Sequence, residues 1–185
     1  MPSKASPGTD GSGMRAVALL RGINVGGVRV PMAELQGLLA DAGYANVKTL
    51  LASGNVLLDA DGKPADVAQR LEKLVGERFA YPARILVVPI EEVAAAVDGY
   101  PFEAADDLHS YVVFTEDAAT TAELAAEAAQ LPEGDRVAAS GSLLYWSVAV
   151  GSTLDSPFGK LLAKKRAPFT TTRNIRTLQK ILAAG

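Results

Sequence analysis

The order of the hydrophobic runs constrains the fold of this chain more than any other sequence feature. In the first half, short apolar runs bounded by turn residues alternate with segments whose apolar residues recur at helical spacing. Strands are expected at residues 15–20, 47–51, 56–58 and 84–88, and helices at residues 31–40 and 64–79. The resulting order, β-α-β-β-α-β, is that of a split βαβ unit.

The second half repeats this order less regularly. A short helix is expected at residues 91–97, followed by strands at 111–114, 136–139 and 143–148 and by helices at 121–129 and 157–165. The last segment contains a helix that Thr172 or Asn174 can cap. The apolar face of this helix consists of Ile175, Leu178, Ile181 and Leu182.

A short sequence echo links the two halves. The segment ASGNVL at residues 52–57 matches ASGSLL at residues 139–144 in four of six positions, at an offset of 87. We therefore expect an α+β fold of two ferredoxin-like (βαββαβ-type) subdomains that arose by duplication. The expected division is a disordered tail at residues 1–13, a first subdomain at 14–90, a connecting helix and linker at 91–110, and a second subdomain at 111–185 with a basic C-terminal helix.

The composition excludes several classes of protein. The 185 residues, 49% of them hydrophobic, suffice for one good core or two small ones. Because the chain has no cysteine, disulfides, thiol catalysis and cysteine-ligated metals are excluded. No apolar run approaches the roughly 20 residues of a membrane span, and residues 1–13 lack the apolar core of a secretory signal. We expect a cytoplasmic protein with no membrane partner.

The first candidate site lies where the first strand ends. The run LLRGINVGG at residues 19–27 places an arginine, an asparagine and three glycines directly after a buried strand. Loops at strand ends are where α/β proteins tend to bind ligands, and the N–H groups of such a turn can hold an anion. The run lacks the spacing of dinucleotide-binding and P-loop motifs. Its candidate ligand-binding residues are Arg21, Gly22, Asn24, Gly26 and Gly27.

Positive charge gathers at the other end of the chain. From Pro157 onward there are seven basic residues and no acidic one, although the net charge is −3. Arginines near the start of a helix become favourable when an anion also binds there. The alternative is that the basic segment docks onto the acidic remainder of the chain, and the sequence leaves both interpretations open. The candidate residues are Arg173, Asn174 and Arg176.

Other candidate chemistry is weak. Ser53 and Asn55 in the expected hairpin turn can contact a ligand or only form the turn. A nucleophilic Ser53 would need a base, and the only histidine, His109, lies in an acidic linker without the spacing of a triad. We expect no metal site, because the acidic residues near Asp106 lack the spacing of a calcium loop. The sequence identifies no catalytic residue and no cofactor.

Taken together, these motifs resemble the DUF1697 family, a bacterial family of unknown function. The resemblance runs from about Met14 to the C-terminus. It is carried by residues 19–27, by Ser53-Gly54-Asn55-Val56 and by Thr171-Thr172-Arg173-Asn174, with Met32, Leu35, Thr177 and Lys180. It implies an α+β fold of two ferredoxin-like subdomains and supplies no reaction. Leu50 and Ile175 stand where family members often have tyrosine and tryptophan.

The leading hypothesis is a protein that binds a small anionic ligand, phosphorylated and of a class that includes nucleotides. The glycine loop and the segment around Arg173 would then meet in space and hold the ligand together. One alternative is an enzyme acting on such a ligand, which needs an Asp, Glu or Lys as base in the same cleft. A second is a nucleic-acid-binding protein that uses the basic C-terminus, for which only the second half offers strand aromatics. A third is an interaction scaffold with a free sheet edge. The oligomeric state stays open.

Overall fold

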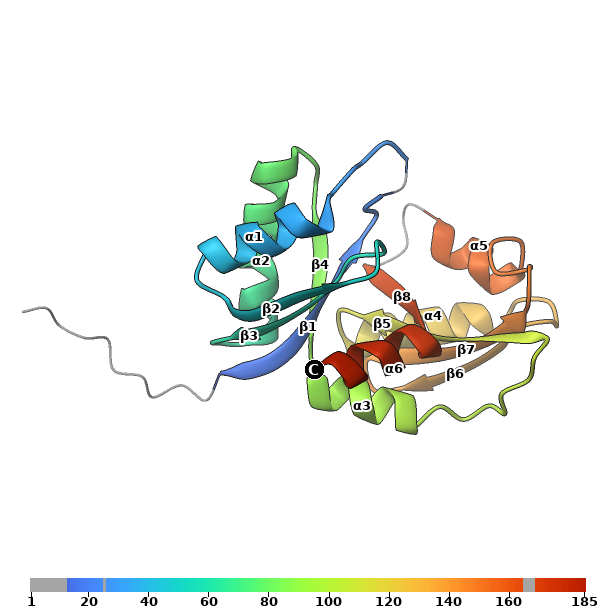
Figure 1. Cartoon of the computed structure of the whole chain (residues 1–185). Coiled ribbons are helices and arrows are strands. Elements are labelled where there is room, and N and C mark those ends of the chain that lie inside the picture. Colours follow the sequence, from blue (N-terminus) through green and yellow to red (C-terminus); the bar gives the residue numbers. More distant parts are fainter. Residues whose placement is uncertain (1–12, 25, 165–168) are drawn as a thin grey trace, which may run out of the picture.

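The two halves of the chain form two four-stranded antiparallel sheets, each with ferredoxin-like strand order (Figure 1). A computed structural model describes residues 13–24, 26–164 and 169–185. The tail expected at residues 1–13 lies outside these ranges except for Gly13. Within the described ranges, no helix is long and apolar enough to cross a membrane.

The first subdomain packs two helices on one face of its sheet. It comprises β1 (Met14–Arg21), α1 (Met32–Asp41), β2 (Ala45–Leu50), β3 (Asn55–Ala60), α2 (Pro64–Phe79) and β4 (Arg84–Pro89), with sheet order β2-β3-β1-β4. Successive side chains of a strand point to opposite faces. Ala18 and Leu20 of β1 therefore pack under α1 and α2, whereas Val17 and Leu19 point to the other face.

The second subdomain has the same architecture. It comprises β5 (Leu108–Thr115), α4 (Ala118–Ala128), β6 (Arg136–Ser140), β7 (Leu143–Ala149), α5 (Pro157–Ala163) and β8 (Thr170–Asn174), with sheet order β6-β7-β5-β8. Leu124 of α4 and Phe158 of α5 pack against Trp146 of β7 on one face of this sheet. The duplication predicted from the sequence is thus present in the topology of the fold.

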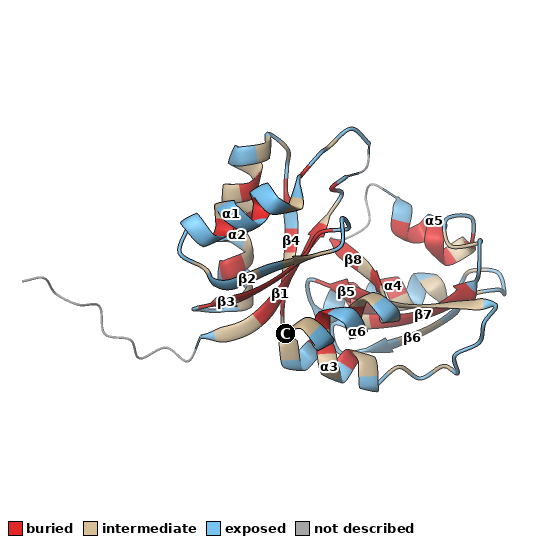
Figure 2. Ribbon diagram, in the orientation of Figure 1, coloured by how far each residue is buried: buried red, intermediate tan, exposed pale blue. Residues whose placement is uncertain are grey.

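A third hydrophobic core joins the two subdomains. Each βαββαβ unit is followed by one more helix, α3 (Ile90–Asp98) after β4 and α6 (Ile175–Ala184) after β8, and these two helices pack on each other. Leu19 of β1, Phe114 of β5 and Ile181 of α6 belong to one buried cluster between the sheets. Figure 2 shows buried residues on the central strands of both sheets. The sheet faces that α1, α2, α4 and α5 leave uncovered are therefore buried inside the molecule.

The structure differs from the sequence-based expectation in the last segment. Residues 170–174 form β8, an edge strand that pairs with β5, where we expected only the cap of a helix. Asn174 is the cap of α6, because its side-chain Oδ1 accepts a hydrogen bond from the Arg176 N–H at 2.9 Å. Helix α5 ends at Ala163, and Lys165, the expected end, lies outside the described residues.

The segment expected to be a connecting helix and linker, residues 91–110, begins in a helix and ends in a strand. It contains most of α3 and the first residues of β5, which begins at Leu108. Val93 and Ala96 of α3 are buried in the core between the sheets. This segment therefore helps to hold the subdomains together and does not act as a spacer.

The two hairpins are not equivalent residue for residue. Leu50 pairs with Asn55, which leaves a loop of four residues, whereas Ser140 pairs with Leu143, which leaves a loop of two. The matching backbone hydrogen bonds join Leu20 to Gly54 and Thr115 to Ser142. Gly54 is therefore equivalent to Ser142, one position away from the offset of 87 that the sequence echo suggests.

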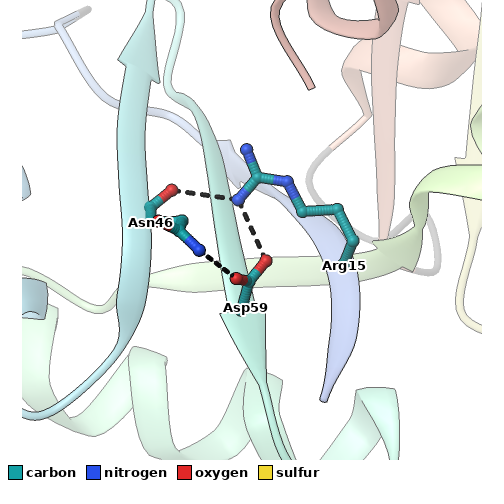
Figure 3. A network of polar contacts seen from close by, with 3 residues as sticks. All are labelled: Arg15, Asn46 and Asp59. Carbon is teal, nitrogen blue, oxygen red and sulfur yellow. Dashed lines mark hydrogen bonds and ion pairs between the residues drawn. The ribbon is translucent and has the colours of Figure 1, made fainter. Parts of the chain in front are cut away.

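A polar network fixes the other end of the first sheet (Figure 3). The Arg15 guanidinium donates to the Asn46 carbonyl at 2.9 Å and to the Asp59 carboxylate at 3.1 Å. Asn46 has a φ of 50° beside the irregular β2–β3 pairing between Ala45 and Lys48. The network pins this bulge at the end of β1 that is remote from Arg21.

Candidate functional site

A groove of about 670 Å³ runs between the two subdomains where β1 ends. Its described lining comes from the β1–α1 loop, the β2–β3 hairpin, β8, α5 and the segment before α5. The lining includes five of the residues predicted from the sequence: Arg21, Gly22, Asn24, Ser53 and Arg173. The two distant motifs therefore meet in space, as the hypothesis required.

Five other predicted residues do not line this groove. Asn55 lies beneath it with no exposed surface, and Asn174 caps α6. Arg176 is exposed on α6. Gly26 and Gly27 have φ values of 59° and 91°, so they shape the loop by adopting backbone conformations that side chains disfavour.

Arg173 is the central residue beneath the groove, and it is buried, with 8% of its surface exposed. Its Nε donates to Asn55 Oδ1 at 2.6 Å, and its Nη1 donates to Thr171 Oγ1 at 2.7 Å and to the Thr172 carbonyl at 2.9 Å. Its Nη2 donates to the Leu20 carbonyl at 2.9 Å and to the carbonyls of Ser53 and Gly54, both at 3.2 Å. The five N–H groups of the guanidinium are thus all used by the protein.

These contacts make Arg173 a clamp between the subdomains. The residue belongs to β8, whereas Leu20, Gly54 and Asn55 belong to the strand end and hairpin of the first subdomain. Its partners are carbonyl, amide and hydroxyl oxygens, which solvate the charge without neutralising it. Burial lowers the pKa of Arg173 to about 10, so the guanidinium remains protonated at neutral pH.

Both loop asparagines are also occupied by the protein. Asn24 donates from Nδ2 to the Ala52 carbonyl at 2.8 Å and accepts at Oδ1 from the Val30 N–H at 3.0 Å. Asn55 donates to the Leu50 carbonyl at 2.9 Å while it accepts from Arg173. We expected these side chains to orient a ligand; in the structure they hold the glycine loop and the hairpin in place.

The two loops approach each other so closely that one residue must be glycine. Gly54 has a φ of 79°, and a Cβ built on it would lie 2.5 Å from Ile23 Cδ1 and 2.9 Å from Leu20 Cβ. The Leu20 N–H also donates to the Gly54 carbonyl at 2.9 Å. The wall of the groove formed by the first subdomain is therefore rigid and tightly packed.

Arg21 is a charged residue of the groove whose side chain has no partner in the described part of the chain. Among the described residues, no hydrogen bond or ion pair engages its guanidinium. Its cross-strand neighbour is a second arginine, Arg84, which is satisfied by Glu116 at 2.7 Å and approaches Glu72 at 3.7 Å. Like charges directly opposite each other in a sheet are unfavourable. Two arginines lie at this position, and the side chain of Arg21 is the one that no described residue pairs with.

The described lining of the groove offers no general base. It contains neither a carboxylate nor a lysine nor a histidine. Nor do the described residues include a group of three or more His, Asp or Glu side chains placed to hold a metal ion. The chemistry available in this lining is electrostatic attraction by arginines and hydrogen bonding by hydroxyl and backbone groups.

Three residues that line this groove were not predicted from the sequence. They are Thr170 of β8, Leu162 of α5 and Leu154, which has 80% of its surface exposed. Leu162 follows the helical spacing of an ordinary core residue, so no pattern separates it from one. Leu154 lies between β7 and α5, where its exposure depends on the path of the chain.

The described surface has no open sheet face on which strand aromatics could stack nucleic-acid bases. Such proteins stack bases on aromatics of an open sheet face. Phe114, Tyr145 and Trp146 are at most 6% exposed, and Tyr111 packs against the core that contains Trp146. The faces that could offer a platform are covered by helices or by the core between the sheets.

The fold and the groove define a class of protein: a tandem pair of ferredoxin-like subdomains with a clamped groove between them. Residues 14–145 match the family described as protein of unknown function (DUF1697), and the chain belongs to this family. It is similar in structure to the conserved bacterial protein SP0830 from Streptococcus pneumoniae, with a TM-score of 0.78 and 23% identity. That likeness covers 93% of this chain and 98% of the other, and it confirms the fold. No curated protein matches the sequence.

Proposed function

We propose that this protein binds a small anionic ligand, phosphorylated and of a class that includes nucleotides, in the groove between its subdomains. The observation that carries the proposal is a pair of positive charges without a carboxylate among the described lining residues. Arg21 lines the groove without a partner among the described residues, and the buried guanidinium of Arg173 lies under it with neutral acceptors. An anion in the groove would supply the missing negative charge.

The two arginines have different parts in this proposal. Arg21 contacts the anion directly, because its N–H groups are not used by described residues. Arg173 has no N–H group left to donate, so it contributes the field of its charge, which is strong where water is excluded. It also holds the two loops that shape the groove.

The described groove residues favour binding over a reaction. An enzyme acting on a phosphorylated ligand by acid–base chemistry needs a general base in contact with it. The described lining has arginine, asparagine, serine and threonine as its polar side chains. We therefore propose a binding protein and assign no catalytic residue.

A thermal-shift experiment with a matched control tests this proposal. Wild type, Arg21→Ala and Arg29→Ala are heated with inorganic phosphate, pyrophosphate, AMP or ATP at constant ionic strength. Arg29 is the control, because it is an exposed arginine of the same loop outside the groove lining. A ligand at 100 times its Kd adds about 2.7 kcal/mol, which corresponds to roughly 5–11 °C for a chain of this size.

The proposal predicts such a shift in wild type and Arg29→Ala and its loss in Arg21→Ala. The same shift in all three proteins, or no shift with any of these anions, would contradict it. A short RNA and a short DNA duplex are included as further ligands. Binding to them that weakens steeply with salt, with no effect of Arg21→Ala, would instead favour the nucleic-acid alternative.

A further inference from the structure

The exposed polar groups and the large exposed apolar side chain of the groove come from different subdomains. The first subdomain contributes Arg21, Gly22 and Ser53, which offer a positive charge, a backbone and a hydroxyl, beside the buried Leu20 and Ile23. The second contributes the threonines of β8, the exposed Leu154 and the largely buried Leu162. A ligand that spans the groove therefore meets charge at one end and leucine side chains at the other.

The protein itself consumes most of the polar capacity of the groove. The guanidinium of Arg173 and the amide of Asn24 are already hydrogen bonded to protein groups, and the Thr171 hydroxyl accepts one bond from Arg173. Ser53 Oγ accepts a hydrogen bond from Asn55, which leaves its own proton to donate. One compact anionic group can be satisfied here, whereas a ligand covered in hydroxyl groups would lose hydrogen bonds to water without replacing them.

One leucine at the groove is unusually exposed. Leu51, Val150 and Leu154 are the large exposed hydrophobic residues of the described chain, with exposed fractions of 47%, 51% and 80%. Of these three, Leu154 is the one that lines the groove. A single exposed leucine is ordinary on a protein surface. Where the leucine lines a groove, a ligand that covers it removes apolar surface from water, and this favours binding.

Building on the proposed anion binding, we infer that the ligand is amphipathic, with one phosphate-like group at Arg21 and an apolar body along Leu154 and Leu162. The groove of about 670 Å³ has the volume of a site for a ligand of this kind. Complete burial of one methylene group strengthens binding about fourfold. Because the groove is open to water, we expect about a twofold gain for each methylene of the ligand.

A homologous series of alkyl phosphates tests this inference. The Kd values of inorganic phosphate, butyl phosphate and hexyl phosphate are measured by calorimetry, with glycerol phosphate as a polar ligand close in size to butyl phosphate. We expect affinity to rise from phosphate through butyl to hexyl phosphate, and glycerol phosphate to bind no better than phosphate. Leu154→Ala should weaken hexyl phosphate severalfold and leave phosphate unchanged.

Val150→Ala is the matched control, because Val150 is also exposed but does not line the groove. It should leave every Kd unchanged. Equal affinities along the series, abolished by Arg21→Ala, would overturn the amphipathic ligand and leave the anion site standing. No binding of any phosphate would overturn both. Chain-length dependence that survives Leu154→Ala would also overturn the inference, since the apolar body would then lie elsewhere.

Discussion

At the scale of single residues, the structure turns a predicted ligand contact into a clamp. Arg173 carries a charge into the interior, and the cost of its desolvation is offset by hydrogen bonds with four backbone carbonyls and two side chains. Removing the side chain would leave the Leu20 carbonyl and the Asn55 side-chain oxygen without the donors that Arg173 supplies. The hydrogen bonds that β8 makes to the first subdomain are therefore concentrated in one residue.

We predict that Arg173→Ala lowers the free energy of unfolding by about 2–3 kcal/mol, the range typical of losing hydrogen bonds to a charged group and leaving buried acceptors unpaired. Arg173→Lys should recover only part of this, because an ammonium has three N–H donors and no planar fork. The measurement is urea denaturation at pH 6 and pH 8. Since the pKa of Arg173 falls only to about 10, the group is charged at both values and the loss should be equal.

The control for this variant is Arg176→Ala. Arg176 is exposed on α6, three positions further along the chain, and its removal should change stability by no more than about 0.5 kcal/mol. Equal losses for both variants would contradict the clamp, because net charge alone would then explain them.

Also at the residue scale, the sequence predicts only part of the site. Glycines and polar residues at strand ends predicted Arg21 and Ser53 as site residues, and both line the groove. The same reasoning cannot tell a side chain that faces a ligand from one that faces its own loop. Asn24 and Asn55 bond to carbonyls of residues 52 and 50, and only the path of the folded chain decides that.

At the scale of elements, alternating and helical patterns predicted the βαββαβ order because each helix and most strands bury one face. Strand β8 was missed, since its sequence Thr170-Thr171-Thr172-Arg173 has no apolar residue. It is an edge strand that satisfies its polar side chains at the boundary between subdomains, as with Thr171 and Arg173. A polar strand of this kind looks like a loop when the sequence is taken alone.

Helix α4 gives a prediction that depends on pH. The Asp117 carboxylate caps it by accepting the Thr120 N–H at 2.7 Å, and this hydrogen bond is the largest cause that lowers the pKa of Asp117. A depressed carboxyl pKa adds stability above its unfolded value of 3.8, and that stability disappears as pH falls through the folded value. Asp117→Ala should therefore be less stable than wild type at pH 7, and this difference should narrow as the pH falls below 3.8.

Thermal denaturation between pH 3 and pH 7 measures this difference. Asp117→Asn is the control, because asparagine caps helices equally well and does not titrate. Its stability relative to Asp117→Ala should stay constant over the range. A gap between wild type and Asp117→Ala that does not change with pH would mean that the charge of the carboxylate has no part in the cap.

At the scale of the whole molecule, the sequence predicted two units but not how they dock. The residues between the sheets, such as Val17, Leu57 and Tyr145, alternate with helix-facing residues as in any strand. Nothing in that pattern tells a face covered by a partner sheet from one covered by a helix. The extra helices α3 and α6 complete this core, and so the two subdomains share hydrophobic surface that neither could bury alone.

We therefore predict that the chain unfolds in one cooperative transition. Trp146, the only tryptophan, is buried in the second subdomain, so its fluorescence reports on that half. Leu19→Ala in the core between the sheets should lower the free energy of unfolding by about 2–5 kcal/mol. Leu35→Ala, in the separate core of the first subdomain, is the comparison.

Urea transitions followed by Trp146 fluorescence and by far-ultraviolet circular dichroism distinguish one cooperative unfolding transition from separate unfolding of the two subdomains. With a shared core, the two probes coincide in wild type, and both leucine variants shift them together. If Leu35→Ala moved the dichroism and left the fluorescence midpoint unchanged, the subdomains would be independent. Coincident shifts would mean that the first subdomain supports the fold around Trp146, and that the groove exists only while both halves are folded.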